Sequence, residues 1–203
     1  GAMLTGALEA AAGGSSTCAR RGDGSVWCWG DNHRGQLGDG TTVKRPNPTR
    51  LTALSASAIE QVAVGASSAC ARGTDGRLWC WGGNETGRLG DGTTIDRLSP
   101  VAVTALGTQV AEVVLRNDPV CARLTTGGLW CWGKNANGGV GDGTTRDRVS
   151  PVRITGLGTS VVGLSAGEGH ACAQRADGTL WCWGRNDWGE LGDGTTWDRT
   201  TPV

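Results

Sequence analysis

Hydrophobic and polar positions alternate along several short stretches of this chain, as they do in β-strands that turn alternate side chains to opposite faces. In the stretch Val-Trp-Cys-Trp at residues 26–29, the two tryptophans share one face and the cysteine points to the other. A second run, at residues 61–64, has counterparts at residues 111–114 and 161–164, and a further short run covers residues 100–103. Together with a hairpin partner for the Trp-Cys-Trp stretch, these runs predict four strands in each fifty or so residues.

The same unit recurs along nearly the whole chain. The string Trp-Cys-Trp-Gly begins at Trp27, Trp79, Trp130 and Trp181. Each copy is followed by Asn, then Gly-Asp-Gly-Thr-Thr, an Arg and a Pro at fixed distances. Repetition at this period is typical of propellers and other repeat folds. We therefore expect one repeat domain over residues 4–203, with approximate units 4–51, 52–103, 104–154 and 155–203. The first three residues, Gly-Ala-Met, break the pattern and are interpreted as a cloning scar.

The cysteine spacing and the turn residues predict one hairpin register. In the first unit the midpoint between Cys18 and Cys28 is Asp23, inside the string Gly-Asp-Gly at residues 22–24. The other units also have Gly at the third position of this loop, where a three-residue hairpin needs a left-handed residue. Cys18 should therefore face Cys28, and the tryptophan face of one unit should pack near the cysteine face of its neighbour.

One set of residues in the fourth unit resembles the RCC1-type (regulator of chromosome condensation) repeat. The set is Ala166-Gly167, His170, Asp177-Gly178-Thr179-Leu180-Trp181, Trp183-Gly184, Asn186, Gly189 and Leu191-Gly192. The resemblance recurs four times in phase and implies an all-β fold, a β-propeller of four RCC1-like blades of about 51 residues each. The family usually builds seven blades, so the chain is expected to form a partial ring, a small closed ring or a self-associating one. The third unit departs from the pattern around residues 116–119.

The cysteines are even in number and occur as four equally spaced pairs. Zinc sites favour shorter Cys-x2–4-Cys spacing and four ligands brought together, so intra-hairpin disulfides are the favoured interpretation. The expected pairs are Cys18–Cys28, Cys70–Cys80, Cys121–Cys131 and Cys172–Cys182. Because disulfides persist outside the cytosol, we expect a secreted or cell-envelope protein.

Composition removes several classes of function. The 203 residues carry a formal net charge of zero, so nothing favours a nucleic-acid partner, and no apolar run is long enough for a membrane span. Glycine, at 36 residues, far exceeds its usual share of roughly 7 %, which suits a chain with many tight turns. The expected disulfides and the neutral charge also argue against the nuclear, chromatin-bound role of the namesake of the resembled family.

The repeated loops offer little for chemistry. Each Gly-Asp-Gly-Thr-Thr loop supplies one carboxylate, fewer oxygens than calcium requires, so Asp39, Asp91, Asp142 and Asp193 are expected to stabilise turns. The arginines six residues later, Arg45, Arg97, Arg148 and Arg199, should pair with a carboxylate or carbonyl within each blade. His33 and His170 are the only histidines, and no nucleophile or metal motif surrounds them. We predict no catalytic residue, no metal and no cofactor, and therefore no enzyme.

Binding sites on a repeat protein are expected where the units differ. The repeated tryptophans are assigned to the core: Trp27, Trp29, Trp79, Trp81, Trp130, Trp132, Trp181 and Trp183. Trp188 and Trp197 lie outside these pairs and are either extra packing at a chain end or seam, or an aromatic contact point. The candidate binding surface is His33, Arg34, Arg185, Trp188 and Trp197.

We therefore predict a disulfide-stapled scaffold that binds an unidentified protein through its variable loops, with self-association into a larger ring as a further interaction. A carbohydrate-binding propeller is the alternative, and it requires one exposed tryptophan in each unit. A propeller-scaffold hydrolase or lyase is a third hypothesis, and it requires acids or a metal at the centre.

Overall fold

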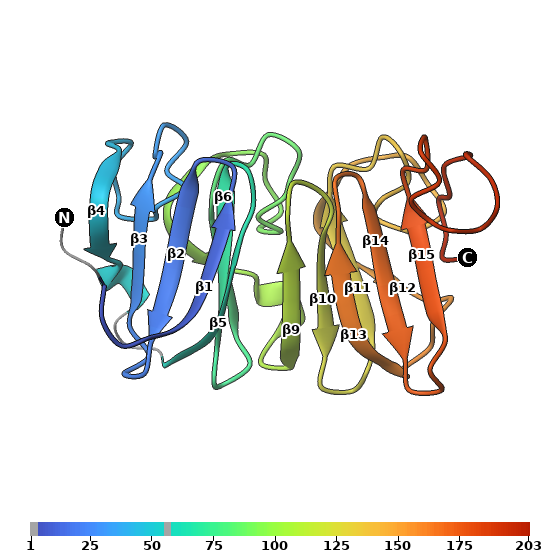
Figure 1. Ribbon diagram of the computed structural model, residues 1–203, viewed down its shortest axis with the longest axis horizontal. Helices are drawn as coiled ribbons and strands as arrows, with labels where there is room; N and C mark the ends of the chain where they lie inside the picture. The colour runs from blue at the N-terminus through green and yellow to red at the C-terminus, as the bar shows by residue number, and fades with distance from the viewer. Residues whose placement is uncertain (1–3, 55–57) are drawn as a thin grey trace.

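The fold is a row of four antiparallel sheets, seen in a computed structural model that describes residues 4–54 and 58–203 (Figure 1). The interpretation of residues 1–3 as a cloning scar lies outside the described residues. We call the sheets blades 1 to 4. Blade 1 contains β1 (Ala7–Gly13), β2 (Ser16–Arg21), β3 (Val26–Gly30) and β4 (Arg45–Arg50); blade 2 contains β5 (Ile59–Val64), β6 (Ser68–Gly73), β7 (Leu78–Gly82) and β8 (Arg97–Ala102). Blade 3 contains β9 (Val110–Leu115), β10 (Val120–Leu124), β11 (Leu129–Gly133) and β12 (Arg148–Ile154); blade 4 contains β13 (Val161–Ala166), β14 (His170–Arg175) and β15 (Leu180–Gly184).

The central hairpin of each blade has the register that the cysteine spacing predicted. In blade 1, β2 pairs with β3 so that Cys18 lies opposite Cys28. The backbone N–H groups of Arg21 and Gly24 close the loop, and Gly24 has a φ of 77°, which an L side chain rarely adopts. Four disulfides join the facing cysteines, one in each blade: Cys18–Cys28, Cys70–Cys80, Cys121–Cys131 and Cys172–Cys182.

The outermost strand of each blade differs from the sequence prediction. The predicted run at residues 100–103 belongs to β8, which begins earlier, at Arg97, and ends at Ala102. Short 3-10 helices that the sequence pattern did not predict follow the outer strand, at Thr52–Leu54 and Thr104–Leu106. In the described part of blade 4 the fourth strand is reduced to two contacts: Arg199 bridges Gly184, and Val203 exchanges backbone hydrogen bonds with Cys182.

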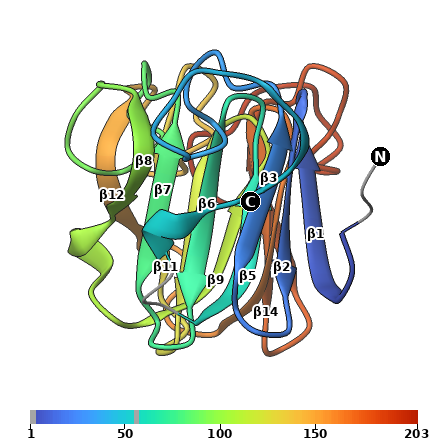
Figure 2. The ribbon, with the colours of Figure 1, turned by 90° about the vertical axis from the view of Figure 1, so that its left-hand side faces the viewer.

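Neighbouring blades pack the tryptophan face of one against the cysteine face of the one before it, as the sequence predicted. The seam between blades 1 and 2 gathers Cys18 and Cys28 with Trp79 and Trp81. The next two seams repeat this arrangement with the corresponding residues. Apolar contacts across three seams therefore form the core. Figure 2 shows the sheets stacked one beside the next.

The blades form an open arc. The inner strands β1, β5, β9 and β13 border a central hollow of about 860 Å³, while the last loop and β4 lie at the far ends of the molecule (Figure 1). Blades 1 and 4 are therefore the two ends of a partial ring, which does not close within the chain. None of the helices in the described residues is long and apolar enough to cross a membrane.

Candidate interaction surface

Four long loops lie together along one edge of the arc. They connect the third strand of each blade to its outer strand and cover residues 31–44, 83–96, 134–147 and 185–198; we call them the rim (Figure 1, upper edge). All five candidate binding residues from the sequence lie in these loops. His33 and Arg34 are in blade 1, whereas Arg185, Trp188 and Trp197 are in blade 4, so the structure places the two groups at opposite ends of the arc.

One fully buried asparagine holds each rim loop in shape. In blade 2 the Asn84 Nδ2 group donates to Asp91 Oδ1 at 3.2 Å and to the carbonyl oxygens of Thr93 and Ile95 at 3.0 and 3.1 Å. Its Oδ1 atom accepts the N–H of Leu89 at 2.9 Å. The equivalent residues Asn32, Asn135 and Asn186 make the same contacts. Since each amide satisfies several backbone groups, the rim backbone is fixed while the side chains at its tips vary.

The repeated Asp-Thr-Arg set supports the same loops. In blade 4, Asp193 accepts hydrogen bonds from the Thr195 hydroxyl at 2.7 Å and from Arg199 Nε at 2.7 Å, and these bonds lower its pKa to about 2. In blade 1, burial works to raise the pKa of Asp39, but hydrogen bonds from Thr41 and Arg45 outweigh it and the pKa is lowered. The carboxylates are thus committed to the turn and to the arginine predicted to pair with them.

The seam between blades 1 and 2 carries an ion pair at rim level. Arg34 donates from Nε and Nη2 to Asp96 at 2.6 and 2.9 Å, and from Nη1 to Glu85 at 3.2 Å. The bond from Arg34 lowers the pKa of Asp96. Arg34 therefore joins two blades, and its fork is not free to contact a partner.

The irregular third unit has a partner across the next seam. Asp118 stands where blade 2 has Ser67, and Arg88 Nη2 of blade 2 lies 3.0 Å from its Oδ2. Both residues are buried; burial raises the pKa of Asp118, and the charge of Arg88 offsets part of that rise. The apparent degeneracy of the sequence is therefore one half of a buried inter-blade ion pair.

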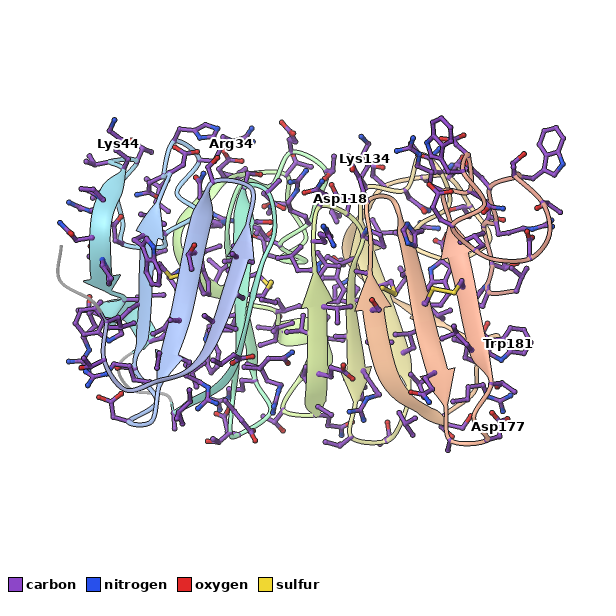
Figure 3. The ribbon with its side chains drawn as sticks, viewed as in Figure 1. Arg34, Lys44, Asp118, Lys134, Asp177 and Trp181 are labelled. Carbon is purple, nitrogen blue, oxygen red and sulfur yellow. A yellow bond between two sulfur atoms is a disulfide. The ribbon has the colours of Figure 1, made fainter. Side chains whose placement is uncertain are left out.

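A polar hollow of about 210 Å³ opens at the rim between blades 3 and 4. Asp118, Lys134, Glu168 and Arg185 are among the residues that line it, so both signs of charge border the same concave surface. Asp118 and Lys134 are labelled near the upper edge of the molecule in Figure 3. Arg185 lies 2.6 Å from Asp187 on its own loop. Within the hollow, Glu168 supplies an acceptor, and Lys134 and Arg185 supply donors.

The repeated tryptophans divide into two sets. Trp81, Trp132 and Trp183, the second of each pair in blades 2 to 4, have no exposed surface, and each indole N–H donates across a seam to the carbonyl oxygen of Gln36, Arg88 or Gly139. The second set is half-buried and consists of the first tryptophan of each pair together with Trp29 of blade 1. Its members are Trp27, Trp29, Trp79, Trp130 and Trp181. Among the described residues, no blade packs against the face that carries Trp29. The carbohydrate alternative requires one exposed tryptophan in each blade, whereas these eight tryptophans are buried or half-buried.

Trp188 and Trp197 are exposed to 84 % and 74 % on the rim of blade 4. The first of the two interpretations offered by the sequence was extra packing at a chain end or seam. Neither side chain packs in this way within the described residues. Their backbones are held by the rim network, since Asn186 Nδ2 donates to the Trp197 carbonyl oxygen at 3.1 Å and Glu190 accepts the Trp188 N–H at 2.9 Å. Two large exposed side chains thus project from loops whose backbones are held in place.

Sequence reasoning missed the residues that fix this surface. One buried asparagine recurs at the same position of each unit. This regularity, with no catalytic partner nearby, was the only sign of its role in the sequence. The Arg88–Asp118 pair carried no signal, because Arg88 varies between units and lies 30 positions from Asp118. His33 is exposed on the rim and pairs with Asp31.

Stacked four-stranded sheets around a common axis, tied by inter-blade tryptophans, define a β-propeller repeat protein. The model of the regulator of chromosome condensation (RCC1) repeat matches residues 23–72, 75–115, 126–174 and 177–203, so the chain belongs to that family. It is 34 % identical over 198 residues to the ultraviolet-B receptor UVR8 of Arabidopsis thaliana, covering 96 % of this chain and 45 % of that protein. It is 29 % identical to the human E3 ubiquitin-protein ligase HERC2, covering 93 % of this chain and 4 % of that protein.

Solved structures show the same fold. Human WBSCR16 superposes with a TM-score of 0.88 at 24 % identity, over 99 % of this chain and 53 % of that one. Yeast RCC1 (Prp20), in its complex with Kap60, superposes with a TM-score of 0.84 at 18 % identity, over 100 % of this chain and 49 % of that one. The chain thus spans less than half of the curated relatives named above and about half of the two solved chains.

Proposed function

We propose that the chain is a non-catalytic scaffold that binds another protein through the rim of blade 4. The observation that carries the proposal is the pair Trp188 and Trp197, exposed to 84 % and 74 % on loops whose backbones are fixed. Exposed tryptophan on a rigid frame is what interface hot spots use, because little conformational entropy is lost on binding. Two solved relatives support a protein partner by their descriptions: yeast RCC1 is bound to Kap60, and Prp20p binds Gsp1p and histones.

The polar hollow beside blade 4 gives this surface its second part. Lys134 and Arg185 can donate to acidic groups of a partner, and Glu168 can accept from basic ones, next to an apolar contact. A patch with apolar anchors and mixed charge fits a folded protein surface better than a nucleic acid, which requires clustered positive charge. Balanced charge over the whole chain agrees with this choice.

The partner proposal predicts that Trp197→Ala lowers affinity at least about tenfold, the loss that a hot-spot tryptophan produces. Proteins captured from the native source by the wild-type chain are compared quantitatively with those captured by Trp197→Ala and by Leu8→Ala. Leu8 is also exposed but lies in β1, away from the rim, so it is the matched control. Equal capture by wild type and Trp197→Ala would contradict the rim as the contact. Binding of the wild-type chain to a glycan array that is lost in Trp197→Ala would favour the carbohydrate alternative.

We also propose that the protein works in an extracytoplasmic, oxidising compartment, as a secreted or cell-envelope component. Four disulfides in a chain without free cysteine support this proposal. Protein purified from its native source under alkylating conditions should show no alkylated cysteine until it is reduced. Alkylation of all eight cysteines before reduction would overturn the proposal.

Self-association through the ends of the arc is the remaining interaction that we propose for this scaffold. It uses surfaces other than the contact through Trp197, so the two interactions can be tested separately.

A further inference from the structure

The two ends of the arc carry the two halves of the seam that joins neighbouring blades. Blade 1 leaves its tryptophan face uncovered, with Trp27 and Trp29 half-buried, and blade 4 leaves its cysteine face uncovered. Both uncovered faces turn toward the reader in Figure 1, on the open side of the arc. Each internal seam therefore shows what would complete either end.

Backbone hydrogen bonds repeat at every internal seam and have unused counterparts at the ends. The N–H groups of Gly40, Gly92 and Gly143 donate to the carbonyl oxygens of Leu98, Val149 and Thr200 in the next blade, at 2.9, 3.0 and 2.8 Å. The equivalent pair at the ends is the Gly194 N–H and the Pro46 carbonyl oxygen. The indole N–H of Trp29 and the carbonyl oxygen of Glu190 correspond in the same way to the tryptophan–carbonyl bonds at 2.8 to 2.9 Å.

The uncovered face of blade 4 exposes an apolar position whose equivalents in the other three blades are buried. Leu180 is 66 % exposed, whereas its equivalents in the other blades, Val26, Leu78 and Leu129, are buried at the seams. Gly38, Gly90 and Gly141 lie against an indole ring of the next blade, so that a Cβ there would come within 2.8 Å of it, but a Cβ on Gly192 would meet nothing within 4 Å. Blade 4 thus presents an unfilled seat for a tryptophan at Gly192.

One residue at each end, Trp188 and Lys44, differs from its equivalents in the other units, and the two are complementary to each other. Trp188 occupies the position of Arg34, and Lys44 occupies the position of Asp96, which are the two residues that pair across the first seam. Applied to the ends, the first seam's geometry places Lys44 against the exposed indole of Trp188. A cation over an indole face is attractive, so a Trp188–Lys44 contact at the ends would take the place of the Arg34–Asp96 pair of the first seam and the Asn137–Asp198 hydrogen bond of the third.

We propose that two copies of this chain dock head to tail, blade 4 of each on blade 1 of the other, and close a two-fold ring of eight blades. Copies joined head to tail form a ring when the rotations from each copy to the next add up to a full turn. Both end faces here open to the same side, as two copies in such a ring require. The inference rests on the self-association proposed above. It assigns Trp188 to the contact between copies, so the outside partner is then left with Trp197 on the rim of blade 4.

Sedimentation equilibrium of the purified chain tests the closed dimer directly. We expect a mass close to twice 20.8 kDa that stays constant as the concentration is raised to about 100 µM. A monomer throughout this range would overturn both self-association and the ring. A mass that keeps growing with concentration would overturn closure, because it indicates an open chain of copies.

A charge on the uncovered face of blade 4 should prevent the dimer without affecting the fold. Leu180→Glu should raise the dimer dissociation constant at least about thirtyfold, because it places a charge in a seam that is apolar in all internal copies. Ile95→Glu makes the same change at an equally exposed site on the rim of blade 2 and should leave the dimer unchanged. A dimer that survives Leu180→Glu would overturn the proposed contact between blade 4 of one copy and blade 1 of the other. It would mean that the copies associate through another surface.

A charge exchange tests the end pair itself. Trp188→Arg should weaken the dimer at least about tenfold, because it sets Arg against Lys44. Adding Lys44→Asp recreates the Arg–Asp pair of the first seam and should restore most of the affinity. Equal weakening by the single and double variants would show that Trp188 and Lys44 do not meet, and would overturn the proposed alignment of the ends.

Discussion

Trp132→Ala is expected to lower the free energy of unfolding by about 3–5 kcal/mol, the loss typical of a buried Trp-to-Ala change. Trp132 has no exposed surface at the seam between blades 2 and 3, and its indole N–H donates to the Arg88 carbonyl oxygen at 2.9 Å. The variant leaves both a cavity and an unsatisfied carbonyl, and the surrounding sheets cannot close the gap without shifting a disulfide-linked hairpin. Urea unfolding followed by far-ultraviolet circular dichroism measures the change.

Trp29→Ala is the matched control, because it removes the same side chain at the same position of the repeat. Trp29 is half-buried, and none of the described blades covers it. At concentrations low enough for a monomer, this variant should lose less than half the stability that Trp132→Ala loses, since burial on one side contributes fewer contacts. Equal losses would mean that the indole stabilises its own blade and contributes little across the seam.

The hairpins and seams could be predicted from the sequence because both depend on local spacing. Nine residues between cysteines, with Gly at the third loop position, fix the pairing of Cys18 with Cys28. The alternation of Trp and Cys then assigns each face, and identical units have to bury unlike faces against each other. The choice of tryptophan within each pair could not be predicted, since Trp79 and Trp81 share a face and only the second reaches the rim loop of the preceding blade.

The surface was predicted less completely, for a physical reason. Variable loops show where units differ but not which neighbours they touch across a seam. Arg34 was grouped with the exposed candidates, yet its fork is taken up by Asp96 and Glu85 of the next blade. Asp118 was interpreted as part of a degenerate unit, and only three-dimensional proximity to Arg88 shows what it does. Contacts of this kind depend on the stacking of blades, which spacing within one unit does not encode.

Asn84→Asp, an almost isosteric change, is expected to cost about 3–5 kcal/mol at neutral pH, because it leaves an uncompensated charge in a buried site. The Nδ2 group of Asn84 donates to Asp91 Oδ1 at 3.2 Å and to two carbonyl oxygens, and an aspartate would set a carboxylate against all three. Asn47→Asp is the control, since Asn47 is exposed in β4 and should change stability by less than about 0.5 kcal/mol.

The pH dependence of this loss separates repulsion from poor packing. Burial among acceptors raises the folded-state pKa of the new carboxyl above the roughly 3.9 of an unfolded aspartate. A raised pKa means that the folded state binds the proton more tightly, so the deficit relative to wild type is full above the folded pKa and shrinks as the pH falls toward about 4. Part of the deficit should persist in acid, because a protonated carboxyl donates one hydrogen bond where the amide donates to several oxygens. A deficit that does not change between neutral pH and about pH 4 would contradict charge repulsion and point to packing at this asparagine.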